Sequence, residues 1–185
     1  MDTPFPLLDT PRLHLREIAL SDADALFAIH SDAPTMRWFG SDPLTHRDQA
    51  EQMAILFAGW YAAGTGIRWG IQRRDDARLI GTCGFFRWNK NWHCCLIGCE
   101  LAVAMQGQGY MREALTAILA YGFQRMALHR IQAETHRANA NSIALLNRLG
   151  FQLEGVHREQ GYWNGEFHDL NCYALLAPTW NAAQE

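Results

Sequence analysis

The sequence predicts a mixed α/β fold in which a mostly antiparallel sheet also contains one pair of parallel strands. Several segments alternate apolar and polar residues, as half-buried strands do, and others repeat apolar residues at the helical period. A polar turn and an Asn-Gly pair each join two strand-like segments, which predicts two hairpins. One helix-like segment follows a glycine bend and lies between two strand-like segments, which predicts a βαβ unit with parallel strands.

The first third of the chain predicts one strand and two helices. Residues 13–18 alternate as a strand does, and Ser21 precedes an acidic turn, so it is expected to cap a helix that ends near residue 30. Thr45 is followed three residues later by an acid, which is typical of a second helix start, and Gly64 predicts its end. The buried face of this second helix is expected to carry Met53, Leu56, Phe57 and Trp60.

The middle of the chain predicts a three-stranded meander. Residues 68–72 and 79–86 flank the polar turn 74–76, and residues 94–103 form the third strand. The segments expected next are a glycine bend at 107–109, a helix over 110–127, a strand over 130–135 and a short helix over 140–149.

Two turns in the last third of the chain have clear signatures. Gly150 suits the left-handed position after a helix, and Phe151 is expected to fold back onto Leu146. Asn164-Gly165 predicts a tight hairpin turn between strands over 151–160 and 167–176.

Length and composition restrict the class of protein. The 185 residues suit a single domain over 1–185, and the 49% of hydrophobic residues suffice for a sizeable core. The net charge of −3 argues against a dedicated nucleic-acid binder. No apolar run is long enough to span a membrane, and the start of the chain has no secretory pattern. Five cysteines without a Cys-x-x-Cys pair then predict reduced thiols and a cytoplasmic location.

The glycine bend is the strongest local sign of chemistry. Gly107 and Gly109 lie between a strand end and a helix start, where backbone N–H groups can approach a phosphate or pyrophosphate. A plain tight turn is the competing interpretation. The bend is not a P-loop, and Arg112 stands where a dinucleotide-binding fingerprint needs its third glycine.

The bend also resembles a known loop. Gln106-x-x-Gly109 followed by Tyr110-Met111 is similar to the acyl-CoA loop of the GNAT N-acyltransferase superfamily, although Met111 departs from the usual glycine or alanine. The form Gly-Gln-Gly-Tyr-Met-x-Glu-Ala resembles the branch of the ribosomal-protein alanine N-acetyltransferases. Further matches, which together span about residues 9–176, are Thr10-Pro11-Arg12-Leu13-x-Leu15-Arg16, Asn139-x-x-Ser142, Leu149-Gly150-Phe151, Glu154-Gly155 and Asn164-Gly165-Glu166-x-x-Asp169.

The resemblance implies a GNAT-like fold in which the two parallel strands splay apart and acetyl-CoA, a co-substrate, lies between them. Its pantetheine arm would pair with the backbone of Leu101, Ala102 and Val103, because a splayed strand leaves donors and acceptors unpaired. Asn139 and Ser142 would contact this arm near the thiol. The pyrophosphate would meet the backbone N–H groups of Gln106, Gly107, Gln108, Gly109, Tyr110 and Met111.

Acyl transfer to an amine needs a base, an oxyanion donor and a proton for the leaving thiolate. The resemblance places Glu134 as the base, acting through water, against the alternative of a solvent-facing strand residue. Glu100 is the second candidate, and its alternative role is a cross-strand ion pair. The tyrosine that often serves as acid would fall at Leu146 and is missing. Ser142 is the substitute acid, unless it only caps the helix, and a backbone N–H within 101–103 would meet the oxyanion.

No metal is expected. His93, Cys94, Cys95 and Cys99 fit no zinc spacing, because adjacent strand residues point to opposite faces. Cys99 is not expected to act as a nucleophile, since no ordered Cys–His pairing is evident.

The resemblance favours transfer of an acetyl group from acetyl-CoA to a protein N-terminal α-amine, such as that of a ribosomal protein, by direct attack in a ternary complex. Polyamines and aminoglycosides are alternative acceptors, and a non-catalytic acyl-CoA sensor is the alternative without turnover. No direct nucleic-acid or membrane contact is expected, and the superfamily leaves a homodimer open. Some of Trp38, Phe39 and Trp60 are expected to face the acceptor.

Overall fold

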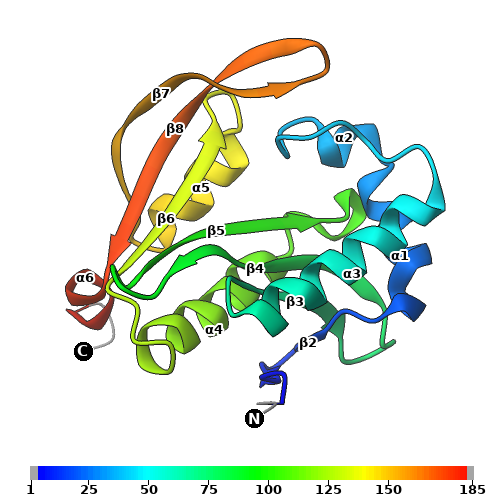
Figure 1. The fold of residues 1–185 in the computed structure, drawn as a ribbon, viewed down its shortest axis with the longest axis horizontal. Helices are drawn as coiled ribbons and strands as arrows, with labels where there is room; N and C mark the ends of the chain where they lie inside the picture. Colours follow the sequence, from blue (N-terminus) through cyan, green and yellow to red (C-terminus); the bar gives the residue numbers. More distant parts are fainter. Residues whose placement is uncertain (1–3, 183–185) are drawn as a thin grey trace.

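The computed structural model describes residues 4–182 and has an eight-stranded sheet at its centre (Figure 1). The strands lie in the order β1-β2-β3-β4-β5-β6-β8-β7, and β5–β6 is the one parallel pair among the strands of this range. The predicted fold class is therefore confirmed. The strands are β1 (Leu8–Asp9), β2 (Leu13–Glu17), β3 (Ile67–Arg73), β4 (Leu79–Asn89), β5 (Cys94–Leu101), β6 (Arg130–His136), β7 (Gln152–Trp163) and β8 (Glu166–Leu176).

Helices cover both faces of the sheet. Buried side chains of α4, including Leu115, Ile118 and Leu119, join one core cluster, whereas Ala50, Ala54 and other residues of α1 and α3 form a second cluster. In Figure 1, α3 lies in front of the sheet and α4 behind it. The helices are α1 (Ala23–His30), α2 (Ala33–Met36), α3 (Arg47–Ala63), α4 (Tyr110–Gln124), α5 (Ala140–Arg148) and α6 (Ala177–Ala182). No helix within residues 4–182 has both the length and the apolar content that crossing a membrane requires.

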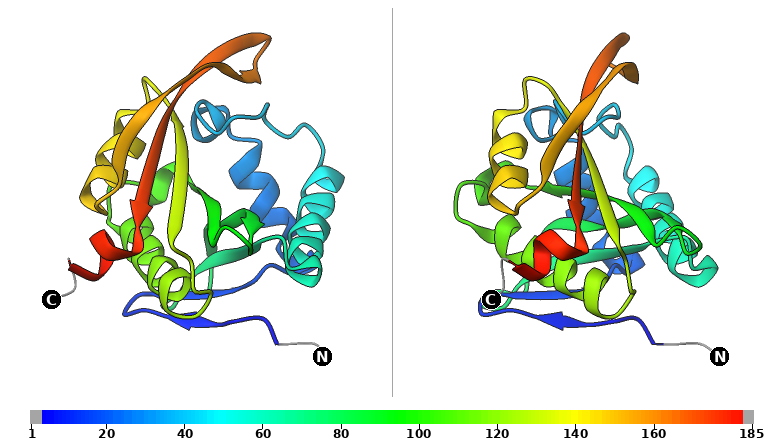
Figure 2. Two further views of the ribbon diagram at one scale, coloured as in Figure 1. Left: turned by 60° about the vertical axis from the view of Figure 1, so that its left-hand side comes forward. Right: turned by 90° about the vertical axis from the view of Figure 1, so that its left-hand side faces the viewer.

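Both turns predicted in the last third are confirmed. Gly150 has a φ of +88°, and the N–H of Phe151 donates to the carbonyl of Leu146 at 3.0 Å, which closes α5 in a Schellman motif. Asn164 and Gly165 have φ values of +51° and +76°, as a type I′ hairpin turn requires. This turn joins β7 to β8, and the hairpin extends beyond the rest of the sheet (Figure 2).

Three local predictions are wrong. Asp22 rather than Ser21 precedes α1, because a 3₁₀ turn from Leu20 to Asp22 takes up the expected first turn. His46 rather than Thr45 caps α3, and the side chain of Gln49 accepts its N–H at 2.9 Å. Leu56 is 52% exposed, because the buried stripe of α3 runs through Ala50, Ala54 and Phe57 instead.

The feature that positions the site is the divergence of β5 and β6. Their parallel pairing runs from Cys94↔Arg130 to Ile97↔Ala133 and then stops, although β5 continues to Leu101 and β6 to His136. Figure 1 shows the two strands separating toward their C-terminal ends. The splayed parallel pair is therefore present.

Candidate active site

The diverging end of β5 carries backbone groups that β6 does not reach. The N–H of Ala102 donates to the carbonyl of Ile80 at 2.9 Å, so even-numbered residues of β5 turn their amides toward β4. The amides of Cys99 and Leu101 therefore face away from β4, past the last pair with β6. The carbonyl of Leu101 accepts the side-chain amide of Gln106 at 2.9 Å. Within residues 101–103, where the pantetheine arm is expected to pair, the N–H of Ala102 is thus already bonded to β4. The N–H of Leu101 points toward the space where β5 and β6 separate.

The loop after β5 ends in an uncapped helix start. Gly107 and Gly109 have φ values of +73° and +82°. Residues other than glycine rarely adopt this left-handed backbone conformation. Gly109 is the N-cap of α4 and provides no side-chain hydrogen bond to it. The first N–H groups of a helix have no partner within the helix, so those of Tyr110 and Met111 are available to an anion. In many helices the side chain of the N-cap residue accepts the N–H of the second or third helical residue, here Met111 or Arg112, and Gly109 has no side chain to do so.

Thr10 and Arg12, near the start of the chain, contact this loop and the first turn of α4. Arg12 donates to the Glu113 carboxylate through Nε at 2.6 Å and to the carbonyl of Gln108 at 3.0 Å. The Thr10 hydroxyl donates to Glu113 Oε1 at 2.6 Å, and the Arg12 guanidinium lies 4.4 Å from the centre of the Tyr110 ring. Burial acts to raise the pKa of Glu113, but the hydrogen bonds from Thr10 and Arg12 outweigh it and lower the pKa.

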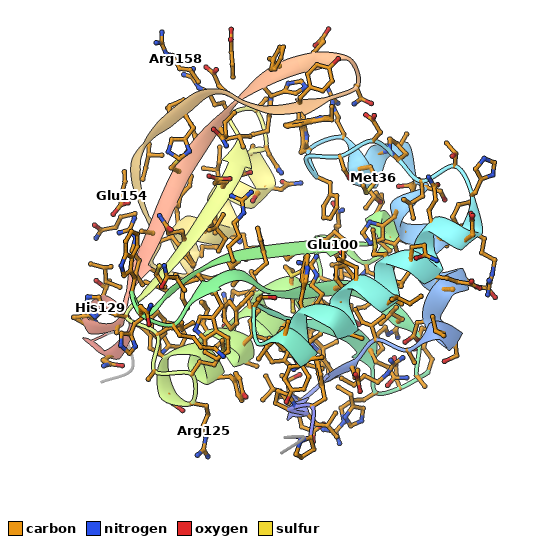
Figure 3. The ribbon with its side chains drawn as sticks, in the orientation of Figure 1. Met36, Glu100, Arg125, His129, Glu154 and Arg158 are labelled. Atoms are coloured by element: carbon orange, nitrogen blue, oxygen red, sulfur yellow. The ribbon has the colours of Figure 1, made fainter. Side chains whose placement is uncertain are left out.

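Glu100 lies in a buried polar network near the end of β5 (Figure 3). Its carboxylate pairs with the guanidinium of Arg68 and accepts the hydroxyl of Thr82, which itself accepts Arg68 Nε at 2.6 Å. His30 Nε2 lies 3.2 Å from Glu100 Oε1, but neither ring nitrogen of His30 makes an aligned hydrogen bond within the described residues. Burial opposes the charge of Glu100, yet Arg68, His30 and Thr82 hold its pKa below the ordinary value.

The ion-pair alternative for Glu100 thus matches its surroundings. A carboxylate that is held ionised by a buried guanidinium and a hydroxyl is a weak proton acceptor. The network also reaches the strand backbone, because Arg68 donates to the carbonyl of Gly98 at 2.9 Å. Arg68 and Glu100 therefore fix the course of β5 where it leaves β6.

Glu134 lies on β6 immediately after Ala133, the last residue paired with β5. Ala133 and Thr135 are buried, so the side chain of Glu134 points to the opposite face, the face of Glu100. The Glu134 side chain is 26% exposed, and its Oε1 lies 3.3 Å from Nδ1 of His157 on β7. Glu134 is therefore a half-buried carboxylate at the point where the sheet opens.

Asn139 and Ser142 lie at the start of α5. The side-chain carbonyl of Asn139 accepts the N–H of Ser142 at 3.1 Å, so Asn139 is the N-cap of the helix and Ser142 is not. The Ser142 side chain lies in the first turn and is half-buried. Leu146, which stands where the resemblance would put a tyrosine, is buried in the main core.

An aromatic cluster joins the segment after α2 to β6 and to the β7–β8 hairpin. The ring of Trp38 stacks on His136 at 4.3 Å between centres, and Trp163 stacks on His168 at 3.8 Å. Trp163 Nε1 donates to the carbonyl of Arg37 at 3.3 Å. Burial, with His168 and Arg37 nearby, lowers the pKa of His136. Of the expected acceptor-facing aromatics, Trp38 lies in this cluster.

The other two expected aromatics lie apart from the cluster. Phe39 packs edge-on against His30, and Trp60 lies beside Phe57 and Phe86. Burial raises the pKa of the Cys99 thiol to about 12, which disfavours a nucleophilic thiolate at neutral pH.

Several residues of the site have no sequence signal of their own. Arg12 and Glu113 occur within the matched motifs, but the motifs do not predict that the two side chains contact each other. Arg68, His30 and His157 belong to no motif, and only their positions on neighbouring strands and helices bring them to Glu100 and Glu134.

The chain matches known proteins over most of its length. Residues 12–152 match the model of the acetyltransferase (GNAT) domain. The chain is 39% identical to the uncharacterized N-acetyltransferase YoaA of Bacillus subtilis, over 94% of this chain and 98% of that protein. It is 32% identical to the ribosomal protein uS5 alanine N-acetyltransferase of Escherichia coli, over 65% of this chain and 63% of that one.

Solved structures show the same fold at lower identity. The spermidine N-acetyltransferase of Vibrio cholerae, in complex with CoA and spermine, superposes with a TM-score of 0.82 at 21% identity, covering 93% of this chain and 99% of that one. The diverging strands, the uncapped glycine loop and the family match agree, and the chain belongs to the GNAT family of N-acetyltransferases.

Proposed function

We propose that this enzyme acetylates the α-amine at the N-terminus of a protein, with Glu134 as the base. The observation that carries the proposal is the position of Glu134: a half-buried carboxylate on the first residue of β6 beyond its pairing with β5. The 32% identity with the uS5 alanine N-acetyltransferase supports a ribosomal-protein type of acceptor.

GNAT enzymes take the acetyl group from acetyl-CoA, and two features of this chain fit that co-substrate. The pyrophosphate suits the loop Gln106, Gly107, Gln108, Gly109, Tyr110 and Met111, because the glycines expose backbone N–H groups and α4 has no capping side chain. The amide-rich arm suits the free edge of β5 at Leu101, with Asn139 and Ser142 at the start of α5 as its further contacts.

In the reaction the neutral amine nitrogen attacks the thioester carbonyl carbon, the C–N bond forms and the C–S bond breaks. Glu134 takes the proton of the amine through a water molecule, and an N–H at the end of β5 stabilises the oxyanion. The Ser142 hydroxyl passes a proton to the leaving thiolate and takes one back from solvent water, so that free CoA thiol and a neutral serine result. An α-amine has a pKa of about 8 and a lysine amine about 10.4, so a single carboxylate base suits an α-amine better.

Two other functions compete with this one. The first is acetylation of a polyamine, because the chain has the fold of a spermidine N-acetyltransferase, although a likeness at 21% identity shows the fold alone. A sensor that binds acyl-CoA without turnover would need neither base nor acid, and Leu146 stands where many family members have a tyrosine.

An acceptor screen separates these functions. The full chain is incubated with acetyl-CoA and a panel of N-terminal peptides, free polyamines and aminoglycosides, and the products are detected by mass. Acetylation confined to peptide α-amines is the expected result. Acetylated polyamine would favour the small-molecule acceptor, and acetyl-CoA binding without any product would favour the sensor.

Glu134→Gln tests the base, with Glu17→Gln as the control, because Glu17 is exposed at the far end of β2. We expect kcat at neutral pH to fall about 100-fold or more in Glu134→Gln and the loss to shrink as the pH rises past the amine pKa of about 8. A pH profile parallel to that of the unmodified enzyme would show that Glu134 is not the base.

A further inference from the structure

Three side chains with metal-binding atoms meet on the face of the sheet that carries Glu134. They are Glu134 on β6, His157 on β7 and Cys172 on β8, and their ligand atoms all lie within 4.8 Å of one another. The sheet register brings them together, because Glu134 pairs with Cys172 and a register shift in β7 places His157 beside both. They form the one such trio with metal-ligand spacing found within residues 4–182.

The spacing of the trio suits a tetrahedral ion. Zinc binds nitrogen and carboxylate oxygen at about 2.0–2.2 Å, so two such ligands of a tetrahedron lie about 3.4 Å apart. Glu134 Oε1 and His157 Nδ1 are 3.3 Å apart. The sulfur of Cys172 lies within 4.8 Å of both other ligand atoms, and it must come to about 3.6 Å from each of them when the ion binds.

The ligand types select the metal. A thiolate, an imidazole and a carboxylate together suit zinc rather than magnesium or calcium, which prefer oxygen ligands alone. Three protein ligands leave one tetrahedral position for water. His157 is 55% exposed, so an ion can reach the trio from solvent.

We propose that Glu134, His157 and Cys172 bind Zn²⁺ reversibly and that the bound ion inhibits the acetyltransferase by occupying its base. The inhibitory part rests on the proposed role of Glu134. On binding, Cys172 releases its thiol proton to solvent, and Glu134 and His157 each supply a lone pair. A Glu134 carboxylate that is bound to zinc cannot accept a proton from the amine.

The alternative to a metal site is an ordinary contact between His157 and Glu134 in which Cys172 takes no part. Such a pair, in which the His157 side chain is 55% exposed, contributes little to stability and needs no thiol. The two interpretations differ in what Cys172 does, because only the zinc site uses its sulfur. The side chain of Cys172 otherwise contacts the carbonyl of Leu170 at 3.6 Å.

Cobalt reports the site without any activity measurement. Co²⁺ is titrated into the reduced full-length chain without acetyl-CoA, and absorption from thiolate-to-cobalt charge transfer and from tetrahedral cobalt is recorded, followed by displacement with Zn²⁺. The test variant is Cys172→Ser, and the matched control is Cys94→Ser, since Cys94 is a half-buried free thiol on β5 outside the trio. His157→Gln is a second test variant, because the side chain of His157 is largely exposed and its replacement spares the core.

We expect both bands in the unmodified chain and in Cys94→Ser. Cys172→Ser should lose the charge-transfer band, and either test variant should weaken Zn²⁺ binding about tenfold or more. A charge-transfer band that persists in Cys172→Ser, or that disappears in Cys94→Ser, would overturn the site.

The inhibitory role is tested by mass detection of the acetylated acceptor at increasing Zn²⁺. Product formation should fall with metal occupancy, recover on adding a chelator, and require at least tenfold more Zn²⁺ in Cys172→Ser. Full activity of the zinc-loaded enzyme would overturn the inhibitory role. Because metal binding is read from the cobalt spectrum, failure of Glu134 as the base would leave the metal result intact, and the two failures are distinguishable.

Discussion

Replacing Glu100 by glutamine should destabilise the protein strongly, because it removes one partner of a buried ion pair. The side chains of Arg68 and Glu100 are 5% and 3% exposed, so the guanidinium would remain inside without its carboxylate. Breaking a buried pair from one side costs about 3–5 kcal/mol of unfolding free energy. For a chain of this size that corresponds to a fall in Tm of about 6–20 °C.

The pH dependence of this loss follows from the direction of the pKa shift. The pKa of Glu100 is lowered in the folded state, so its contribution is present above the unfolded value of about 4.3 and is lost as the pH falls through the folded pKa. The stability difference between the unmodified protein and Glu100→Gln should therefore be largest near neutral pH and shrink in acid.

Chemical denaturation at neutral and acidic pH measures both effects. Glu51→Gln is the control, because Glu51 pairs with Arg47 on the exposed side of α3 and should leave Tm unchanged. The double variant Arg68→Met/Glu100→Leu should be more stable than Glu100→Gln alone, since it removes both charges. Equal stability of Glu100→Gln and the unmodified protein at neutral pH would refute the network as described.

Three further outcomes follow from particular contacts. Glu113→Gln should raise the KM for acetyl-CoA several-fold and leave the KM for the acceptor unchanged, because Glu113 braces the glycine loop; steady-state kinetics with each substrate varied checks this. Gly150→Ala should cost about 1–2 kcal/mol by denaturation, since its φ is +88°, whereas Gly155→Ala, in open space, should be near neutral. The pKa of His136 is lowered in the folded state, first by burial and then by His168, so the folded protein should lose stability as the pH falls below about 6.5. His136→Gln should flatten that dependence between neutral pH and about pH 5 in a denaturation series.

Much of the fold could be predicted because its signals are local. Gly64 has a φ of +62° and ends α3, as the sequence indicates, and the Asn164-Gly165 turn, the Gly150 stop and the glycine bend also depend on a few adjacent residues. The predicted start of α3 differs from the observed one because histidine is not a preferred cap residue, and the side chain of Gln49 accepts the N–H of His46. The predicted buried face of α3 is partly wrong, because Leu56 is 52% exposed and lies outside the buried stripe, which the helical period alone does not reveal.

The glycine loop can be predicted from adjacent residues, whereas the surroundings of the proposed base cannot. The glycine loop and the helix start lie at the expected residues, because Gly107 and Gly109 adopt the positive φ values that this bend requires. The position of Glu134 at the end of a strand predicts it as the base, but no sequence pattern predicts its neighbours His157 and Cys172. A strand pairing that joins residues far apart along the chain has no local signature.

By itself the sequence determined the order of the main strands and helices, without β1, α2 and α6, as well as the glycine bend and the family. Periodicity, turn residues and motifs act over short stretches of chain. Only the tertiary structure decided where β5 leaves β6, that Arg12 supports the loop from the far end of the chain, and that Arg68 neutralises Glu100. These contacts depend on sheet register and packing between distant segments, and a one-residue change of register would turn each side chain to the other face.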